Sequence, residues 1–142
     1  MPEPAPVAGA VHRTAVEVRY AETDQQGVAY HAHYLVWMEV GRTAFLEALG
    51  FPYRALEERG VVFSVVDARC RYVGAARYAD RVEIATRVTR LRSRTVDFGY
   101  EISTGGRPVA HGETRLVALG GDRRPCRIPA DVENALRRAG PG

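Results

Sequence analysis

The polar segment 20–34 places a carboxylate, Asp24, a few residues before the start of an expected helix. The first amides of a helix lack intrahelical acceptors and lie at the positive end of its dipole, so they can hold a developing oxyanion. Asp24 could act as a nucleophile or as a base toward water. Together these elements suffice to hydrolyse an activated acyl compound such as a thioester. A structural interpretation stays open, in which Asp24 only forms an Asx turn with the amides of Gln26 and Gly27.

Two histidines, His31 and His33, follow in the same segment. Such a pair could suggest zinc on a strand, but residues i and i+2 do not share a face at the start of a helix. No third ligand is evident, so we expect no metal. Further along the helix, Glu39 is a carboxylate among apolar residues, and a buried carboxylate usually has a partner. Arg42, one turn later, is the expected partner, and an acid/base role for Glu39 stays open.

The elements that would position these residues follow from hydrophobic periodicity. Residues 32–49 are apolar almost all round a helical wheel, which is typical of a helix enclosed by other structure. Alternating segments predict strands, and Gly105–Gly106 is a strong hairpin signal between the last two. The expected elements are strands over 14–20, 62–73, 81–92, 94–104 and 107–119, and helices over 32–49, 52–59 and 130–138. On the first strand Val16, Val18 and Tyr20 share one side.

The order of the expected elements predicts an α+β fold, with an antiparallel sheet curled around one long helix. The uncovered face and edge of the sheet suggest a homo-oligomer.

Length and composition limit the classes of function that the chain can have. The 142 residues suit one domain, which we expect over 13–142 after a loose N-terminal arm over 1–12. No apolar run is long enough to span a membrane and the first residues do not resemble a signal peptide, so we expect a cytoplasmic protein. All 20 basic residues are arginines, scattered along the chain with a net charge of +3, which favours a phosphorylated small molecule over nucleic acid. P-loop, dinucleotide, CxxC and serine-elbow motifs are absent from the sequence.

The stretch from Asp24 to His31, D-Q-Q-G-V-A-Y-H, followed by Tyr34 and the expected helix, resembles a known family. It is similar to the hotdog-fold acyl-CoA thioesterases of the 4-hydroxybenzoyl-CoA thioesterase and Tol-Pal-associated (YbgC-like) type. The resemblance continues in order through 41–43, 49–53, 77–80, 112–117, 124–125 and 127–129, and so covers nearly the whole chain after the arm.

The resemblance implies a sheet of about five strands wrapped around one long central helix. It also implies hydrolysis of acyl-CoA to free acid and CoA without a cofactor. Asp24 matches the nucleophile or general base, and the backbone amide at His31 matches the group that polarises the thioester carbonyl. The His31 side chain matches a motif histidine with a catalytic or orienting role, while Gly27, Tyr30 and Tyr34 match substrate-binding positions. The family's site forms at a dimer interface, so a homodimer or homotetramer is expected. An acyl carrier protein could replace CoA, and Arg77, Arg90, Arg92 and Arg94 are candidates for CoA phosphates.

Two other functions remain as alternatives. A hotdog hydratase or dehydratase pairs a histidine with a carboxylate, and His31 with Asp24 could imitate that pair. A non-catalytic module that binds acyl thioesters is the third hypothesis. Acyl-chain preference depends on pocket shape, which the sequence pattern does not give.

Overall fold

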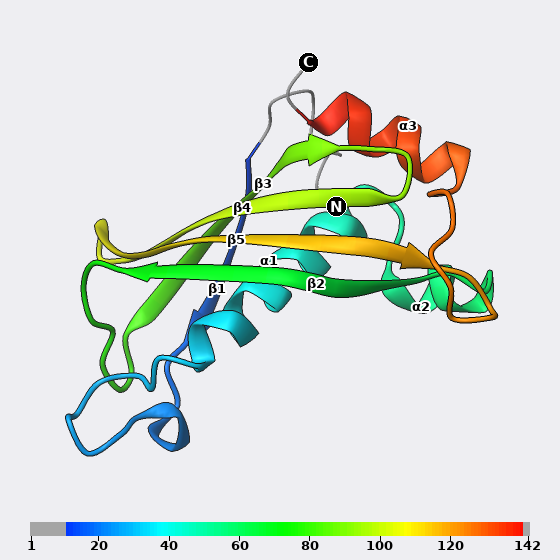
Figure 1. Cartoon of the computed structure of the whole chain (residues 1–142). Helices are drawn as coiled ribbons and strands as arrows, with labels where there is room; N and C mark the ends of the chain where they lie inside the picture. Colours follow the sequence, from blue (N-terminus) through cyan, green and yellow to red (C-terminus); the bar gives the residue numbers. More distant parts are fainter. Residues whose placement is uncertain (1–10, 141–142) are drawn as a thin grey trace.

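The computed structural model describes residues 11–140 (Figure 1). The elements are β1 (His12–Glu17), the 3-10 turn η1 (Tyr20–Glu22), α1 (His33–Ala48), α2 (Tyr53–Glu58), β2 (Val62–Tyr72), β3 (Arg81–Leu91), β4 (Thr95–Thr104), β5 (Arg107–Leu119) and α3 (Ala130–Ala139). The long helix and the last four strands match the expected ranges to within one residue at each end. Most of the expected arm lies outside the described residues, and its last residue, His12, already begins β1.

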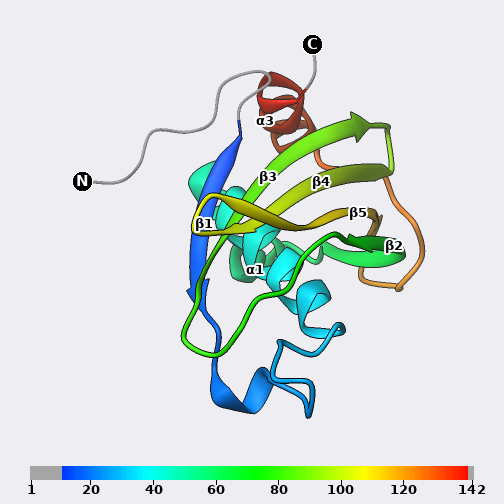
Figure 2. The same cartoon turned by 90° about the vertical axis from the view of Figure 1, so that its left-hand side faces the viewer.

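The five strands form one antiparallel sheet in the order β1-β3-β4-β5-β2, so β1 and β2 are its two edges. The sheet curves, and α1 lies on its concave side (Figure 2). Gly105 and Gly106 both adopt positive φ, at 57° and 76°, and close the turn between β4 and β5. The predicted α+β fold with an antiparallel sheet and this hairpin is therefore confirmed.

Helix α1 packs mainly on β3 and β1 through a buried side that includes Trp37, Met38 and Phe45. Gly41 sits where the helix comes closest to β3. A Cβ atom at this position would lie 2.5 Å from Thr86 Oγ1 and 2.7 Å from Ile84 Cγ2. Only glycine fits this approach, which fixes how deeply α1 lies against the sheet and where its N-terminal end stands.

The expectation that Tyr20 continues the first strand, on the same side as Val16 and Val18, is wrong. The chain leaves the sheet after Glu17, and the Glu22 carboxylate accepts a hydrogen bond of 2.8 Å from the Arg19 amide. This contact stabilises η1 and turns Tyr20 outward, where its side chain is 76% exposed. Its ring meets Tyr78 edge-on, with centroids 5.6 Å apart.

The apolar side of β2 is left uncovered in the single chain. A bulge interrupts the pairing with β5 between Val65 and Asp67, and Val66 is 57% exposed. The neighbouring surface of α1 also exposes Leu35 and Val36, although the sequence pattern predicted an enclosed helix. One apolar strip, made of the β2 edge and the first turn of α1, therefore faces solvent.

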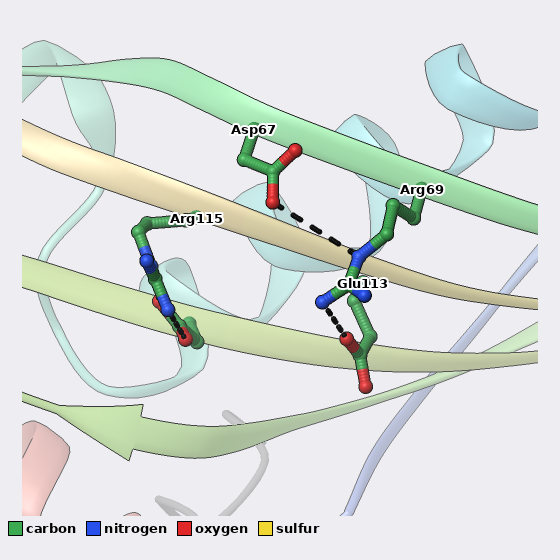
Figure 3. A network of polar contacts seen from close by, with 5 residues as sticks. Asp67, Arg69, Glu113 and Arg115 are labelled. Atoms are coloured by element: carbon green, nitrogen blue, oxygen red, sulfur yellow. Dashed lines mark hydrogen bonds and ion pairs between the residues drawn. The ribbon is translucent and has the colours of Figure 1, made fainter.

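The outer face of the sheet carries paired charges instead (Figure 3). Arg115 on β5 holds Asp97 on β4 through two hydrogen bonds of 2.9 and 3.0 Å. Arg69 on β2 bonds Glu113 on β5 at 2.9 Å and approaches Asp67 at 4.0 Å. Such exposed pairs add little stability each, and they give this face the character of a solvated sheet surface. Within residues 11–140, no helix is long and apolar enough to cross a membrane.

Candidate active site

The loop between η1 and α1 is a tight, hydrogen-bonded turn. Thr23 and Ala29 form an isolated antiparallel bridge, and inside it the Asp24 amide donates to the Val28 carbonyl at 2.9 Å. The Gly27 amide donates to the Asp24 carbonyl at 2.9 Å, and Gly27 adopts a φ of +78°. A side chain at this φ is strained, so glycine allows the turn in which Asp24 pairs with Val28.

Asp24 itself is half-buried and its carboxylate is oriented. Its Oδ1 accepts a hydrogen bond of 2.8 Å from the Gln26 amide, so the Asx turn of the structural interpretation is present. Its Oδ2 accepts no hydrogen bond from any residue that the structure describes. The turn therefore fixes one oxygen and leaves the other available, which makes the two interpretations of Asp24 compatible.

The first turn of α1 leaves two neighbouring amides free. The amides of His33, Tyr34 and Leu35 donate to carbonyls three residues earlier, at 2.9, 3.3 and 3.2 Å. The amides of His31 and Ala32 have no acceptor among the described residues. The N-cap residue is Ala32, so no side chain caps these donors. Two unsatisfied N–H groups at the positive end of a 16-residue helix form a site for a developing negative charge.

The predicted aromatic residues surround the start of α1. Tyr30 is 45% exposed, and its ring centroid lies 4.4 Å from that of His31. The His31 imidazole is exposed and also meets the ring of Tyr72 edge-on at 6.2 Å. Tyr34 is only 2% exposed and packs against Trp37 at 4.7 Å. Tyr34 therefore belongs to the core of the single chain, one turn inside the helix from the free amides.

Sequence reasoning missed Tyr72, the last residue of β2. Its hydroxyl donates a hydrogen bond of 2.7 Å to the His31 carbonyl, which ties the sheet edge to the start of the helix. Burial raises the pKa of Tyr72 to about 12, and the neighbouring Cys70 and Tyr34 add to the shift. Tyr72 therefore keeps its proton at neutral pH. No local signal marks this residue, because its partner lies 41 positions away and the contact depends on where β2 ends.

Sequence reasoning also missed Glu22, whose side chain is almost fully buried. Burial acts to raise the pKa of Glu22, but hydrogen bonds from Arg19 and the charges of Arg19 and His33 outweigh it and leave the pKa below its usual value. The carboxylate is thus charged, with His33 Nδ1 3.8 Å away. Glu22 also accepts the Tyr30 amide through its own carbonyl at 2.7 Å, so it anchors both ends of the Asp24 loop.

The two histidines have different neighbours. The His31 ring lies beside Tyr30 and Tyr72, whereas His33 lies beside Glu22. Within the described part of the chain, no cluster of three or more His, Cys, Asp or Glu side chains could hold a metal ion.

The expected pairing of Glu39 with Arg42 is present, but the burial is reversed. Arg42 Nη2 lies 3.8 Å from Glu39 Oε1, and it is Arg42 that is buried while the Glu39 side chain is 62% exposed. Arg42 Nε also donates to the Tyr53 hydroxyl at 3.2 Å. Glu39 faces a shallow groove of about 350 Å³ on the exposed side of α1, which begins at Val36.

Other surface features do not converge on Asp24. The arginines suggested for CoA phosphates are all exposed: Arg77, Arg90, Arg92 and Arg94. A larger open groove of about 740 Å³ lies across β2, β5, β4 and β3 and contains the Arg69–Glu113 and His111–Glu101 pairs. Arg69 and His111 are matched there by carboxylates, whereas Arg71 and Arg87 form no ion pair among the described residues.

The chain is similar to known proteins along most of its length. Residues 18–136 match the Thioesterase-like superfamily. The chain is 45% identical to YneP of Bacillus subtilis over 92 residues, which are 65% of this chain and 67% of that protein. It is 30% identical over 123 residues to the acyl-CoA thioesterase YbgC of Haemophilus influenzae, covering 85% of this chain and 90% of that one. The structure of a DHNA-CoA thioesterase from Staphylococcus aureus superposes with a TM-score of 0.85 at 32% identity, covering 88% of this chain and 87% of that one.

Proposed function

The chain belongs to the Thioesterase-like superfamily, and from this premise we propose that it hydrolyses an acyl-CoA to the free acid and CoA. One observation carries the proposal. The same short loop holds a carboxylate with one free oxygen, on Asp24, and ends at two amides without acceptors, on His31 and Ala32. A carbonyl that rests its oxygen on these amides exposes its carbon to a carboxylate or to a water molecule beside it.

The reaction needs only these groups, and two routes are compatible with them. In one, an Asp24 oxygen bonds to the thioester carbon, the C–S bond breaks, CoA leaves as thiolate, and water hydrolyses the resulting anhydride. In the other, Asp24 takes a proton from water, the hydroxide adds to the carbon, and the same C–S bond breaks. In both, the amides donate hydrogen bonds to the negatively charged oxygen of the tetrahedral intermediate. The exposed His31 imidazole beside them is suited to orient the substrate or to move a proton.

We also propose that two copies of the chain complete the site. The exposed apolar residues of the β2 edge and of the first turn of α1 include Val65, Val66, Leu35 and Val36. A second copy related by a two-fold axis would cover this strip on both chains. The groove along α1 starts at Val36, one turn from the free amides, and would then be enclosed for an acyl group.

The remaining parts of the proposal rest on the chain's membership of this family. We place α1 as the single central helix of a hotdog arrangement within one domain over 13–142. Gly27 allows the loop, Tyr30 is proposed to line the acyl site beside it, and the buried Tyr34 supports the start of α1 from the core. A cytoplasmic location and a homodimer, or a homotetramer of such dimers, remain predictions. The acyl donor can be CoA or an acyl carrier protein.

The purified protein with a panel of aliphatic and aromatic acyl-CoA substrates tests the proposal. A thiol reagent measures the release of CoA, and we expect turnover above background for at least one acyl class. Background rates across the panel would contradict the proposal. Loss of enoyl absorbance without thiol release would instead identify a hydratase, and tight acyl-CoA binding without turnover would identify a binding module.

A further inference from the structure

We propose that Tyr72 is a positioning residue of this reaction, whose hydroxyl holds the His31 carbonyl so that the Ala32 amide of the same peptide meets the substrate oxygen. The inference rests on the proposed thioester hydrolysis. It concerns a residue that acts through the backbone of another segment and does not itself bond to the reacting atoms.

The contact between Tyr72 and the start of α1 consists of one hydrogen bond and two ring contacts. The Tyr72 hydroxyl donates to the His31 carbonyl at 2.7 Å. The phenol ring stands edge-on to the buried Tyr34, with centroids 5.1 Å apart and planes at 88°. The ring also stands edge-on to His31 at 6.2 Å and 87°. Tyr72 is 43% exposed, so this hydrogen bond and the two ring contacts are what hold its side chain against the start of α1.

The helix start needs such an anchor because it lacks one of its own. Ala32 occupies the N-cap position, and no side chain of the first turn bonds an amide there. Within the backbone, the His31 carbonyl accepts only the long bond of 3.3 Å from the Tyr34 amide. Without Tyr72, rotation of the His31–Ala32 peptide would cost little, and the Ala32 amide, which belongs to that peptide, would turn with it. The hydrogen bond from β2 therefore fixes the direction of the Ala32 donor.

The bond also strengthens one donor. A hydrogen bond accepted by a peptide carbonyl polarises the whole peptide unit, and the His31 carbonyl shares its peptide with the Ala32 amide. The Ala32 N–H thus becomes a better donor to the negative oxygen of the intermediate. This benefit grows as charge develops, so it acts mainly on the transition state.

The first test is Tyr72→Phe, which removes the hydroxyl and keeps the ring packed on Tyr34. We expect kcat to fall by about 10- to 100-fold because the Ala32 donor loses its alignment. KM should stay within about twofold, since the uncharged substrate gains less from this donor. The matched control is Tyr78→Phe, which removes an exposed hydroxyl that bonds no described residue, and it should leave kcat unchanged. Light scattering and thermal unfolding check that oligomeric state and stability are retained.

A second measurement separates positioning from mere packing. The carbonyl ¹³C shift of His31 should move in Tyr72→Phe and not in Tyr78→Phe. Fluorinated tyrosines placed at position 72 have more acidic phenols, and kcat at neutral pH should rise with that acidity while the phenol stays protonated. If wild-type protein turns over acyl-CoA and Tyr72→Phe keeps its kcat, the inference about Tyr72 is wrong and the proposed function stands. If wild-type protein has no turnover, the proposed function fails, and an unmoved His31 carbonyl shift would independently refute the hydrogen bond.

Discussion

Replacing Asp24 separates its chemical role from its role in the turn. In Asp24→Asn the side-chain oxygen can still accept the Gln26 amide, which lies 2.8 Å from Oδ1 in the wild type. The loop should therefore keep its shape while the free carboxylate oxygen becomes an uncharged NH₂ group. Because general-base or nucleophilic catalysis is then lost, we expect kcat to fall by about 10²- to 10⁴-fold.

Asp24→Ala removes the turn bond as well. Loss of one such hydrogen bond costs about 0.5–1.5 kcal/mol of stability. For a chain of 142 residues this lowers the melting temperature by about 1–6 °C, and Asp24→Asn should show little of that change. Asp67→Asn is the control, because Asp67 lies on the outer face of the sheet and its loss should leave kcat unchanged.

Thiol release from the best acyl-CoA gives kcat, and thermal unfolding gives the stability of each variant. A stable Asp24→Asn protein that keeps more than about a tenth of wild-type kcat would refute the reasoning, since such a loss is smaller than general-base catalysis contributes. Glu39→Gln tests the competing carboxylate on α1. A greater loss of kcat in this variant than in Asp24→Asn would move the catalyst to Glu39.

Three further predictions concern the frame around the site. Gly41→Ala should lower the melting temperature. Overpacking against Thr86 and Ile84 destabilises the fold by about 1–3 kcal/mol, whereas the higher helix propensity of alanine stabilises it by only about 1 kcal/mol. A higher melting temperature would contradict the close approach of α1 to β3. Val66→Glu should convert the proposed dimer to monomer and reduce turnover, because the charge would be buried in the interface. Light scattering measures the mass, and thiol release measures the turnover. An unchanged mass and an unchanged rate would show that the β2 edge is not the interface. Glu22→Gln should lower stability most at pH values above 4.5, the ordinary pKa of its carboxyl, and the difference from wild type should shrink as pH falls through the lowered folded-state pKa. A difference that grows toward acid pH would reverse the assigned direction of that pKa.

Patterns local in the chain predicted most of the fold. Strand alternation, the apolar helix over 32–49 and the Gly105–Gly106 turn depend on neighbouring residues, and the structure confirms them. Tyr20 was misplaced because a capping contact of Glu22 outweighs strand alternation. On α1, an almost continuous apolar pattern cannot show which side meets the sheet, so the burial of Glu39 and Arg42 was reversed.

The candidate site also combines residues that local sequence patterns predict with a residue that they miss. Asp24 and the free amide of His31 lie in one loop, so their spacing in the sequence already predicts that they act together. Tyr72 reaches that loop from the far end of β2, and its contribution depends on strand register and on the bulge after Val65. Such long-range contacts follow from tertiary packing, and no sequence motif predicts them.

The most direct measurement is a crystal structure of Asp24→Asn with a bound acyl-CoA. The account predicts that the thioester oxygen lies within hydrogen-bond distance, about 2.7–3.2 Å, of the His31 or Ala32 amide, with residue 24 facing the carbonyl carbon. A thioester bound elsewhere, or one whose carbonyl points away from the start of α1, would contradict it.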